Sequence, residues 1–347
     1  FRSLSSLEFI SPHYYSKLNR IMFSNSTQRK YWTFSDENEL QRLRDEANQK
    51  YTKAHKMKEG EEWLFLSSAE ERVLLLHYQL QLRDFCRKFQ PAMPRAVAGT
   101  AFHYFKRFYL NNSVMDYHPK EILVTCVFLA CKVEEFNVSI HQFVSNIKGD
   151  REKASDIIIN NEMLLMRHLN YQLTAHNPFR AVEGSLIDIK TRSQLVNPER
   201  LRPGVEDALD KLQLTDCCLL FAPSQIALAA ILHSVSKLQE NLDSFVTEVL
   251  LGPEHKEYIH HIIEIIRKIR SMIRSFDPPS RDIIKGLEKR LERCRNQENN
   301  PDSQIYKEKM RENVDDEDFD MGPRVHTDSD KTKTGLPGIT SLSSNSS

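Results

Sequence analysis

Glycine is scarce in this sequence. Only 10 of the 347 residues are glycine, and no two of them are spaced as G-x-G. That absence removes the fingerprint of a dinucleotide-binding fold and the glycine-rich loop of a protein kinase. The patterns G-x-x-x-x-G-K and G-x-S-x-G do not occur either. P-loop nucleotide hydrolases and α/β-hydrolases therefore lack their usual signatures here.

Cysteine is also rare. The chain has six cysteines, none of them in a C-x-x-C pair, and most lie within apolar helical patterns. Reduced cysteine in such a pattern behaves as a small hydrophobic residue. We therefore expect neither a structural zinc site nor a disulfide framework, and we expect a reducing compartment, either cytosol or nucleus.

Neither an excess of charge nor a long apolar run is present. Lys and Arg number 48 and so do Asp and Glu, which gives a formal net charge of zero. This balance argues against a protein whose main role is to bind nucleic acid, because such a protein normally carries an excess of basic residues. The longest apolar run, 122–131, is much shorter than the ~20 residues of a membrane span. Residues 1–15 show no apolar core of a secretory signal.

What the sequence does contain is helical periodicity. Apolar residues recur at helical spacing along most of the chain, and no segment is typical of a strand, so we predict an all-α fold. Ser67 and Glu70 form a capping-box pattern at the start of one helix. The predicted helices are 35–51, 69–89, 95–110, 119–133, 139–147, 151–169, 179–190, 204–219, 223–238, 242–250, 254–275 and 281–295.

Two of these helices indicate an internal repeat. Pro119 and Pro223 each open a helix that is apolar on nearly every face, and the two prolines are 104 residues apart. Proline is favoured in the first turn of a helix, and a helix that is apolar all round is normally buried. We predict two five-helix bundles in tandem, each built around one such helix.

The predicted bundles are flanked by other segments. Residues 1–34 are expected to be a disordered leader, of which 1–21, before the first Met, are a candidate for sequence that the mature protein lacks. A helix and linker follow at 35–65, then the bundles at 66–174 and 175–277, and an amphipathic helix at 278–300. The tail, 301–347, is polar with an acidic run at 315–320, and such a composition predicts disorder.

Catalytic chemistry has little support in the sequence. Glu257 and His260 form an E-x-x-H pattern, but a di-iron bundle needs two such motifs and two further glutamates. No local motif marks a nucleophile. We therefore predict no catalytic residue, no metal and no cofactor, and we keep a helical di-iron enzyme as the catalytic alternative.

Three segments together are distinctive. YFKRFYLNN (104–112), FLACKVEEF (128–136) and NEMLLMRHLNYQL (161–173) occur in that order and spacing. They resemble the cyclin box, and a second bundle from about 179 to 275 fits the two-box architecture of the cyclin family. The resemblance implies a protein without an active site, which binds a cyclin-dependent kinase and holds the kinase C-helix in its active position.

The resemblance also implies which residues bind the kinase. The lysine and glutamate that contact the kinase C-helix in the family fall on Lys132 and Glu162. Apolar groove positions and the glutamates of the motif complete the predicted set, which is Lys132, Val133, Glu134, Glu135, Glu162, Met166, Tyr171 and Leu173. The substrate-recruiting patch of cell-cycle members has only a doubtful counterpart at 71–75.

Three further segments resemble one transcription-associated branch of the family. They are 29–44, 89–114 and 289–294. This implies a kinase that phosphorylates the activation loops of other kinases and the C-terminal repeats of RNA polymerase II. It also implies a RING-finger assembly factor, the core of transcription factor IIH as partners, and a nuclear location. Direct nucleic-acid and membrane contacts are not expected. The two terminal helices, 35–51 and 281–295, are expected to pack together.

Two further alternatives remain open. A cyclin of the Mediator or elongation type would share the fold and bind another kinase. A DNA-binding initiation factor with cyclin-like repeats would need a basic face, which the neutral composition disfavours.

Overall fold

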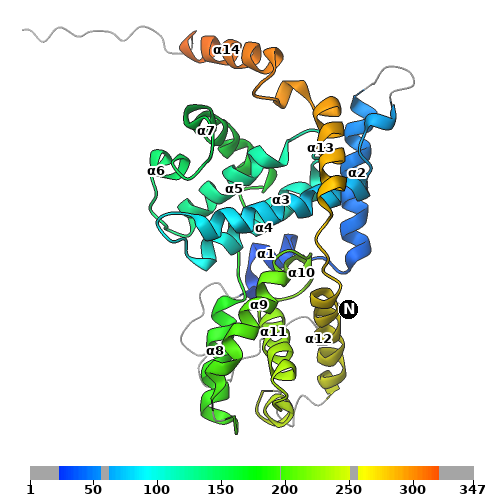
Figure 1. Ribbon diagram of the computed structural model, residues 1–347, viewed down its shortest axis with the longest axis vertical. Coiled ribbons are helices and arrows are strands. Elements are labelled where there is room, and N and C mark those ends of the chain that lie inside the picture. The colour runs from blue at the N-terminus through cyan, green and yellow to red at the C-terminus, as the bar shows by residue number, and fades with distance from the viewer. Residues whose placement is uncertain (1–22, 56–61, 196, 251–256, 320–347) are drawn as a thin grey trace, which may run out of the picture.

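The computed structural model describes residues 23–55, 62–195, 197–250 and 257–319. These residues form helices and turns and contain no strand (Figure 1). The prediction of an all-α protein is confirmed. The helices form two bundles, one above the other in Figure 1, and most of the described chain before and after them lies beside the first bundle.

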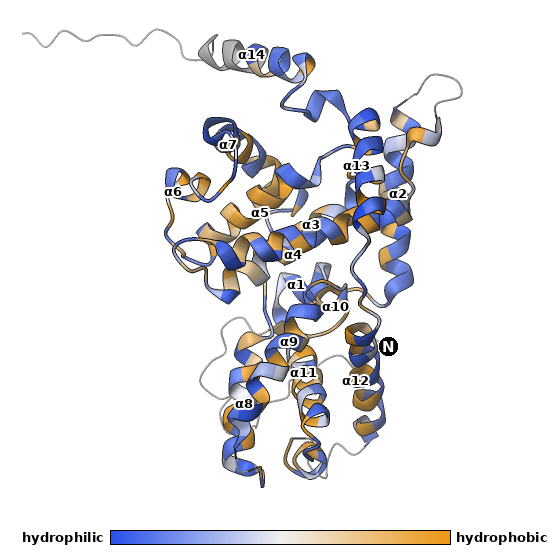
Figure 2. Cartoon of the chain, viewed as in Figure 1, coloured by the Kyte–Doolittle hydropathy of each residue, from blue (hydrophilic) through white to orange (hydrophobic). Residues whose placement is uncertain are grey.

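The first bundle is built around a buried helix. Its helices are α3 (Ser68–Lys88), α4 (Arg95–Asn111), α5 (Pro119–Val133), α6 (Ile140–Val144) and α7 (Arg151–His168). Helix α5 packs against α3, α4 and α7, and ten of its residues are buried. Figure 2 shows it apolar along most of its length. An all-round apolar helix is stable only inside such a bundle, as its sequence predicts.

The second bundle repeats this plan. It contains α8 (Phe179–Arg192), α9 (Arg202–Leu212), α10 (Cys217–Leu220), α11 (Pro223–Lys237), a π-helical turn η5 (Phe245–Leu250) and α12 (Ile259–Arg274). A short 3-10 helix, η4 (Pro198–Leu201), precedes α9. Helix α11 is central and packs against α8, α9 and α12.

The predicted helix 204–219 is interrupted. It ends at Leu212, and α10 begins only at Cys217. Thr215 stabilises the break, because its hydroxyl donates to the Leu212 carbonyl at 2.8 Å and accepts from the Cys217 N–H at 3.3 Å. The Thr215 carbonyl accepts a hydrogen bond from Lys106 of the first bundle. The break therefore serves the contact between bundles, which local periodicity does not reveal.

The two central helices match in detail. Both α5 and α11 are 15 residues long and begin with the prolines 104 residues apart. Each ends two residues before a left-handed residue, Glu135 at φ 56° and Gln239 at φ 55°. In both, the next N–H bonds back to the carbonyl five residues earlier, at 2.9 Å from Phe136 and 3.1 Å from Glu240. These are Schellman ends, and the predicted repeat is confirmed in its geometry.

Residues 23–54, which we call the N-terminal clamp, join the two bundles. The clamp contains η2 (Phe23–Asn25), α1 (Thr27–Tyr31) and α2 (Glu37–Ala54). Trp32 and Leu40 are buried with Leu110 of the first bundle and Leu219 of the second. The expectation of a disordered leader up to residue 34 is wrong for 23–34, because this buried contact orders them. Residues 1–22 lie outside the described residues.

The C-terminal helix α13 (Arg281–Cys294) covers α3. Its buried face completes the first core with Ile284, Leu287 and Leu291. The expected pairing with the N-terminal helix is limited to its end, where Tyr51 of α2 donates to the Cys294 carbonyl at 2.7 Å. Arg290 also bonds Glu70 and the carbonyls around the short helix η3 (Glu62–Leu64).

The tail beyond α13 is more ordered than its composition predicts. A 3-10 helix, η7 (Gln297–Asn299), is followed by α14 (Gln304–Phe319), so the expectation of disorder is wrong for 301–319. The chain is anchored by Asp116, whose carboxylate accepts from Asn296 at 2.8 Å and Asn299 at 2.9 Å. Residues 320–347 lie outside the described part.

Candidate functional site

The end of α5 meets the middle of α7 at an ion pair on the first bundle. Lys132 Nζ lies 2.6 Å from Glu162 Oε1 and 2.8 Å from Oε2. The lysine side chain is 51% exposed, whereas that of the glutamate is 18% exposed. The ammonium also lies 4.9 Å from the ring centroid of Phe128, which is within cation–π range. The pair presents hydrogen-bonding groups at the surface in a fixed arrangement.

Exposed apolar side chains lie on the same two helices as this pair and just after α7. Val133 is 36% exposed, Ile159 55%, Met163 47% and Tyr171 60%. Solvated positions on a monomer are usually polar, so a group of large apolar side chains indicates a contact surface. We call this surface the docking corner. It comprises Lys132, Val133, Ile159, Glu162, Met163, Met166, Tyr171 and Leu173.

The two helices end in the same way at this corner. Helix α5 is followed by left-handed Glu135, and α7 is followed by left-handed Asn170 and Tyr171, with φ of 51° and 55°. The Tyr171 N–H reaches the Met166 carbonyl at 2.9 Å, and its hydroxyl lies 3.7 Å from Met163 Sδ. A bulky residue in the left-handed region is strained, and strain of this kind concentrates at functional sites.

A buried arginine fixes the segment after Tyr171. Arg107 of α4 is 0% exposed and donates to the carbonyls of Gln172 at 3.1 Å and Thr174 at 3.2 Å. Burial lowers its pKa to about 10, so it stays charged at neutral pH. Its guanidinium also lies 5.3 Å from the Trp32 ring centroid. The docking corner is thus coupled to the N-terminal clamp through one side chain.

The two predicted glutamates after α5 have different surroundings. Glu134 accepts a hydrogen bond from the buried Thr100 hydroxyl at 2.6 Å, and Thr100 in turn accepts from Asn177 at 3.1 Å. Its carboxylate is therefore engaged within the molecule and holds the corner in place. Glu135 is exposed at the rim. A direct contact of either residue with a partner stays a prediction.

The sequence missed part of this surface. Ile159 and Met163 were not predicted, although with Met166 they follow the i, i+4, i+7 spacing of one helix face. Leu165 and Leu169, which lie near Glu162 in sequence, are completely buried. Helix α7 carries two apolar stripes, one in the core and one exposed. Spacing alone finds both stripes but does not say which one the bundle covers.

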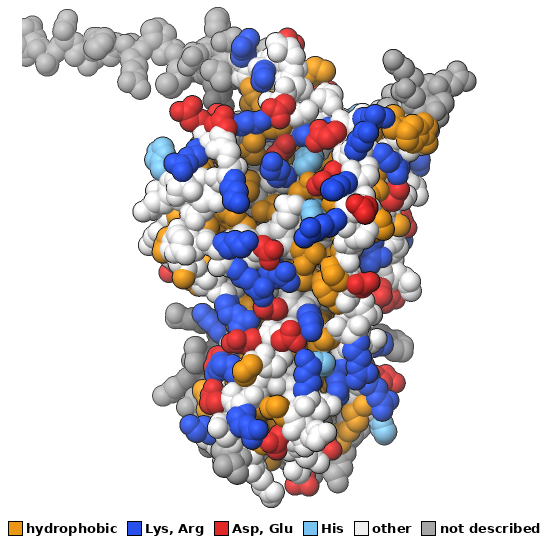
Figure 3. All heavy atoms as spheres, in the orientation of Figure 1, with side chains coloured by type: hydrophobic (Ala, Val, Ile, Leu, Met, Phe, Trp, Pro, Cys, Tyr) orange, Lys and Arg blue, Asp and Glu red, His pale blue; other side chains and the backbone are white. Residues whose placement is uncertain are grey.

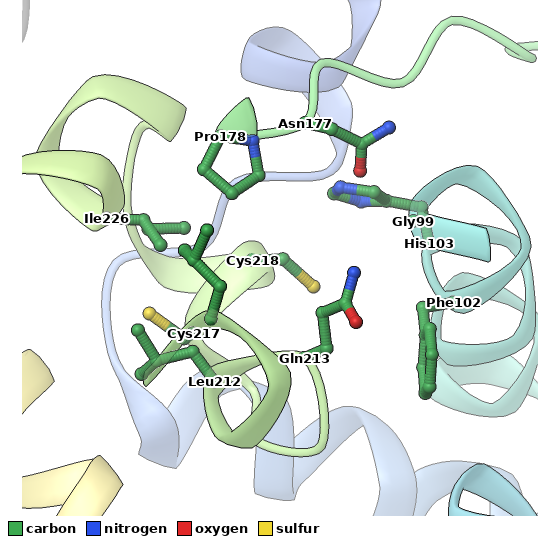
Figure 4. Close-up of a pocket in the computed structure, with 11 residues that line it drawn as sticks. Gly99, Phe102, His103, Asn177, Pro178, Leu212, Gln213, Cys217, Cys218 and Ile226 are labelled. Atoms are coloured by element: carbon green, nitrogen blue, oxygen red, sulfur yellow. The ribbon is translucent and has the colours of Figure 1, made fainter. Parts of the chain in front are cut away.

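Two hollows lie where the bundles meet. The smaller, about 20 Å³, is lined by α4, the chain around Pro178, and α9 to α11 (Figure 4). It has room for about one water molecule. The larger, about 490 Å³, lies between α2, α3 and the end of α12. Arg72 and Val73 from the doubtful recruiting patch line it, whereas Glu71 and Leu74 are buried.

The metal alternative finds no geometric support in the described part of the chain. Glu257, His260, His261 and Glu264 are all exposed. Among the described residues, no three His, Cys, Asp or Glu side chains gather as a metal site would require. Within the same residues, no helix is both long and apolar enough to span a bilayer.

Comparison with protein families identifies the class. Residues 39–174 match the cyclin N-terminal domain and residues 177–274 match the cyclin C-terminal domain. The chain belongs to the cyclin family. Within it, the chain is 45% identical to cyclin-H of Xenopus laevis over 284 residues, which cover 80% of this chain and 88% of that protein. It is 32% identical to cyclin-H1-1 of Arabidopsis thaliana, over 66% and 68% of the two chains.

Solved structures of kinase complexes contain similar chains. One, in the CAK complex of Chaetomium thermophilum bound to ATP-gamma-S, aligns with a TM-score of 0.69 at 25% identity and covers 90% of this chain and 98% of its own. Another, in the yeast TFIIK (Kin28/Ccl1/Tfb3) complex, aligns with a TM-score of 0.58 at 26% identity and covers 72% of this chain and all of its own.

Proposed function

We propose that this chain is the cyclin subunit of a CDK-activating kinase and that its docking corner binds the kinase. The observation that carries the proposal is the group of exposed apolar side chains around the Lys132–Glu162 pair, because grouped apolar side chains at a surface are typical of a protein–protein contact. By resemblance, Lys132 and Glu162 fall on positions that contact the kinase C-helix in the family. The apolar positions that line the kinase groove fall on Val133, Met166, Tyr171 and Leu173. Met166 and Leu173, half-buried beside the pair, would line the groove for that helix.

The chemistry of activation takes place on the kinase. In the active conformer, a glutamate of the kinase C-helix pairs with the lysine that binds the nucleotide phosphates. A surface that fits only the inward position of this helix binds the active conformer more tightly and shifts the population toward it. The cyclin therefore acts as a regulatory subunit and needs no catalytic residue.

Similarity to cyclin-H proteins supports a more specific role. The complex would phosphorylate kinase activation loops and the C-terminal repeats of RNA polymerase II within transcription factor IIH, in the nucleus. The solved complexes with similar chains are named CAK and TFIIK, and this supports a cyclin-dependent kinase as the partner. A RING-finger assembly factor and the core of transcription factor IIH are the further partners that we propose.

A pull-down from nuclear extract tests the assignment. Tagged full-length chain is used as bait, bound proteins are identified by mass spectrometry, and kinase activity is assayed on a polymerase repeat peptide. Recovery of one cyclin-dependent kinase with a RING-finger protein is expected. Recovery of a kinase with Mediator or elongation subunits would contradict the CDK-activating role and support the other transcriptional cyclins. Recovery of no kinase would contradict kinase binding itself.

A further inference from the structure

The second bundle has its own version of the docking corner, at the end of α11. With the 104-residue offset, Lys237 takes the place of Val133, and His233 takes the place of Leu129, which is 2% exposed in the first core. A buried leucine is thus replaced by an imidazole. His233 is 8% exposed, and neither of its ring nitrogens has a hydrogen-bond partner among the described residues.

Four cations on three helices lie near enough to this imidazole to act on its charge. They are Lys211 of α9, Lys237 of α11, and Arg270 and Arg274 of α12, and all four lower the pKa of His233 after the larger effect of burial. Arg270 and Arg274 are four residues apart and so lie on one face of α12. Figure 3 shows Lys and Arg side chains gathered over α11 and α12. We call His233 and these four residues the basic cluster.

The cluster is only partly neutralised. Asp207 of α9 lies 3.1 Å from both Lys211 Nζ and Lys237 Nζ. Among the described residues, four cations and this one carboxylate leave three positive charges in excess, counting His233 as neutral. The two lysine side chains are 40% and 49% exposed, so an anion from solvent can reach them. Repulsion between these like charges raises the free energy of the folded chain, and a bound anion would lower it again.

We propose that the basic cluster binds a phosphorylated serine or threonine peptide. A phosphate carries close to two negative charges and three acceptor oxygens at one point, which suits a compact group of cations in which Lys211 and Lys237 both lie 3.1 Å from Asp207. Nucleic acid instead spreads its charges along a backbone and is bound by a stripe of cations. The acidic run of the chain's own tail, where described, lies on α14 at the opposite end of the molecule (Figure 1).

This inference rests on the proposed function for the choice of peptide. If the kinase complex phosphorylates tandem polymerase repeats, then a repeat that is already phosphorylated becomes a ligand. Binding of that repeat by the second bundle would hold neighbouring, unmodified repeats near the kinase. The effective concentration of the substrate then rises without a new contact at the active site.

Peptide binding to the full-length chain tests the proposal. Fluorescence anisotropy compares a polymerase repeat peptide with phosphate, the same peptide without phosphate, and one with glutamate at the phosphorylated position. The phosphopeptide is expected to bind at least tenfold more tightly than the other two, and the double variant Lys237→Ala/Arg274→Ala is expected to abolish that preference. The control Lys190→Ala/Lys268→Ala removes two exposed lysines of the same bundle and is expected to keep it.

Other outcomes overturn the proposal. Equal binding of the phosphate and glutamate peptides would indicate a general acidic site, and preferred binding of single-stranded DNA or RNA would indicate a nucleic-acid surface. Loss of the preference in the control would show that total charge, not the cluster, is responsible. Activation of the kinase on an unphosphorylated single repeat is measured in parallel and should not change in either variant. Failure of activation in the wild type would contradict the proposed function and not the phosphate site.

Discussion

At the scale of single residues, the free energy that the Lys132–Glu162 pair contributes depends on whether water or a partner covers it. An ion pair exposed to water contributes about 0–1 kcal/mol to folding, and Lys132 is half exposed in the free chain. The same pair covered by a partner loses its water. Removing one member then leaves the other charge buried and unpaired, which costs about 2–5 kcal/mol of binding free energy.

Substitution Lys132→Ala should therefore separate binding from stability. We expect the free energy of unfolding to change by less than about 1 kcal/mol and the affinity for the kinase to fall by about 30-fold or more. Urea unfolding and titration calorimetry measure the two. Lys120→Ala is the matched control, because Lys120 is exposed at the other end of the same helix. Equal loss of affinity in both variants would contradict a specific role for the pair.

A second residue-scale prediction concerns Glu71, which is 5% exposed. Its carboxylate accepts from the Ser113 hydroxyl and from Asn48 Nδ2 at 3.1 Å, yet burial raises its pKa to about 7 from an ordinary 4.5. Between these two pH values the folded chain holds a proton that the unfolded chain has released. Stability from this group is therefore full below pH 4.5 and is lost as the pH rises to 7.

The variant Glu71→Gln should remove this dependence, because the amide keeps an acceptor oxygen and does not ionise. We expect the wild type to lose on the order of 3 kcal/mol relative to the variant between pH 5 and pH 8. Urea unfolding at the two pH values gives the difference. Glu46→Gln, at an exposed carboxylate of α2, should behave as the wild type. Parallel pH dependence in Glu71→Gln and the wild type would rule out the shifted pKa.

At the scale of elements, capping residues, prolines and helical periodicity predicted most of the helices. The order of the remaining segments depends on tertiary contacts. The capping box of Ser67 and Glu70 is present as predicted, and both proline-led helices start at their prolines. Residues 23–34 and 301–319 were predicted to be disordered because few of their residues are apolar. They are ordered by partners distant in sequence, such as Leu219 for Trp32 and Asn160 for Tyr306. Composition carries no information about such partners.

In the docking corner, too, some residues were predicted from the sequence and others are revealed only by the tertiary structure. The resemblance supplied Lys132 and Glu162, and the structure places them in contact. Ile159 and Met163 were missed, because an exposed apolar stripe and a core stripe have the same spacing on α7. The engagement of Glu134 with Thr100 depends on how α4 and α5 cross, which no local pattern encodes.

The N-terminal clamp offers an element-scale test. Leu40 is 0% exposed and packs with Trp32, Leu110 and Leu219 where the two bundles meet. Truncation Leu40→Ala should cost about 2–5 kcal/mol of unfolding free energy, because a cavity is left in a buried contact. Leu43→Ala, at a half-buried position of the same helix, is the control and should cost less. Urea unfolding compares them, and equal losses would mean that the clamp does not bury Leu40 as described.

At the scale of the whole molecule, two bundles of one plan are held together by the clamp and by the linker between the bundles, residues 169–178. Arg44 of the clamp bonds Asp216 of the second bundle at 2.7 Å, and Gln28 accepts from the N–H of His176 in the linker at 2.5 Å. The repeat then differs at its corners. The first corner carries an apolar surface with an ion pair, and the second carries cations around an imidazole. Two bundles of one plan thus carry surfaces of different chemistry.

The central claim is that the docking corner activates the kinase. The most direct measurement is the activity of the purified kinase recovered in the pull-down, titrated with this chain and assayed on an unphosphorylated repeat peptide. Three chains are compared: the wild type, Lys132→Ala/Glu162→Ala, and the control Lys120→Ala/Glu152→Ala, which removes an exposed residue of each sign from the same two helices. We predict activation by the wild type and the control, and half-maximal activation of the first double variant only at a concentration at least about 30-fold higher. Activation curves that coincide for all three chains would contradict the claim.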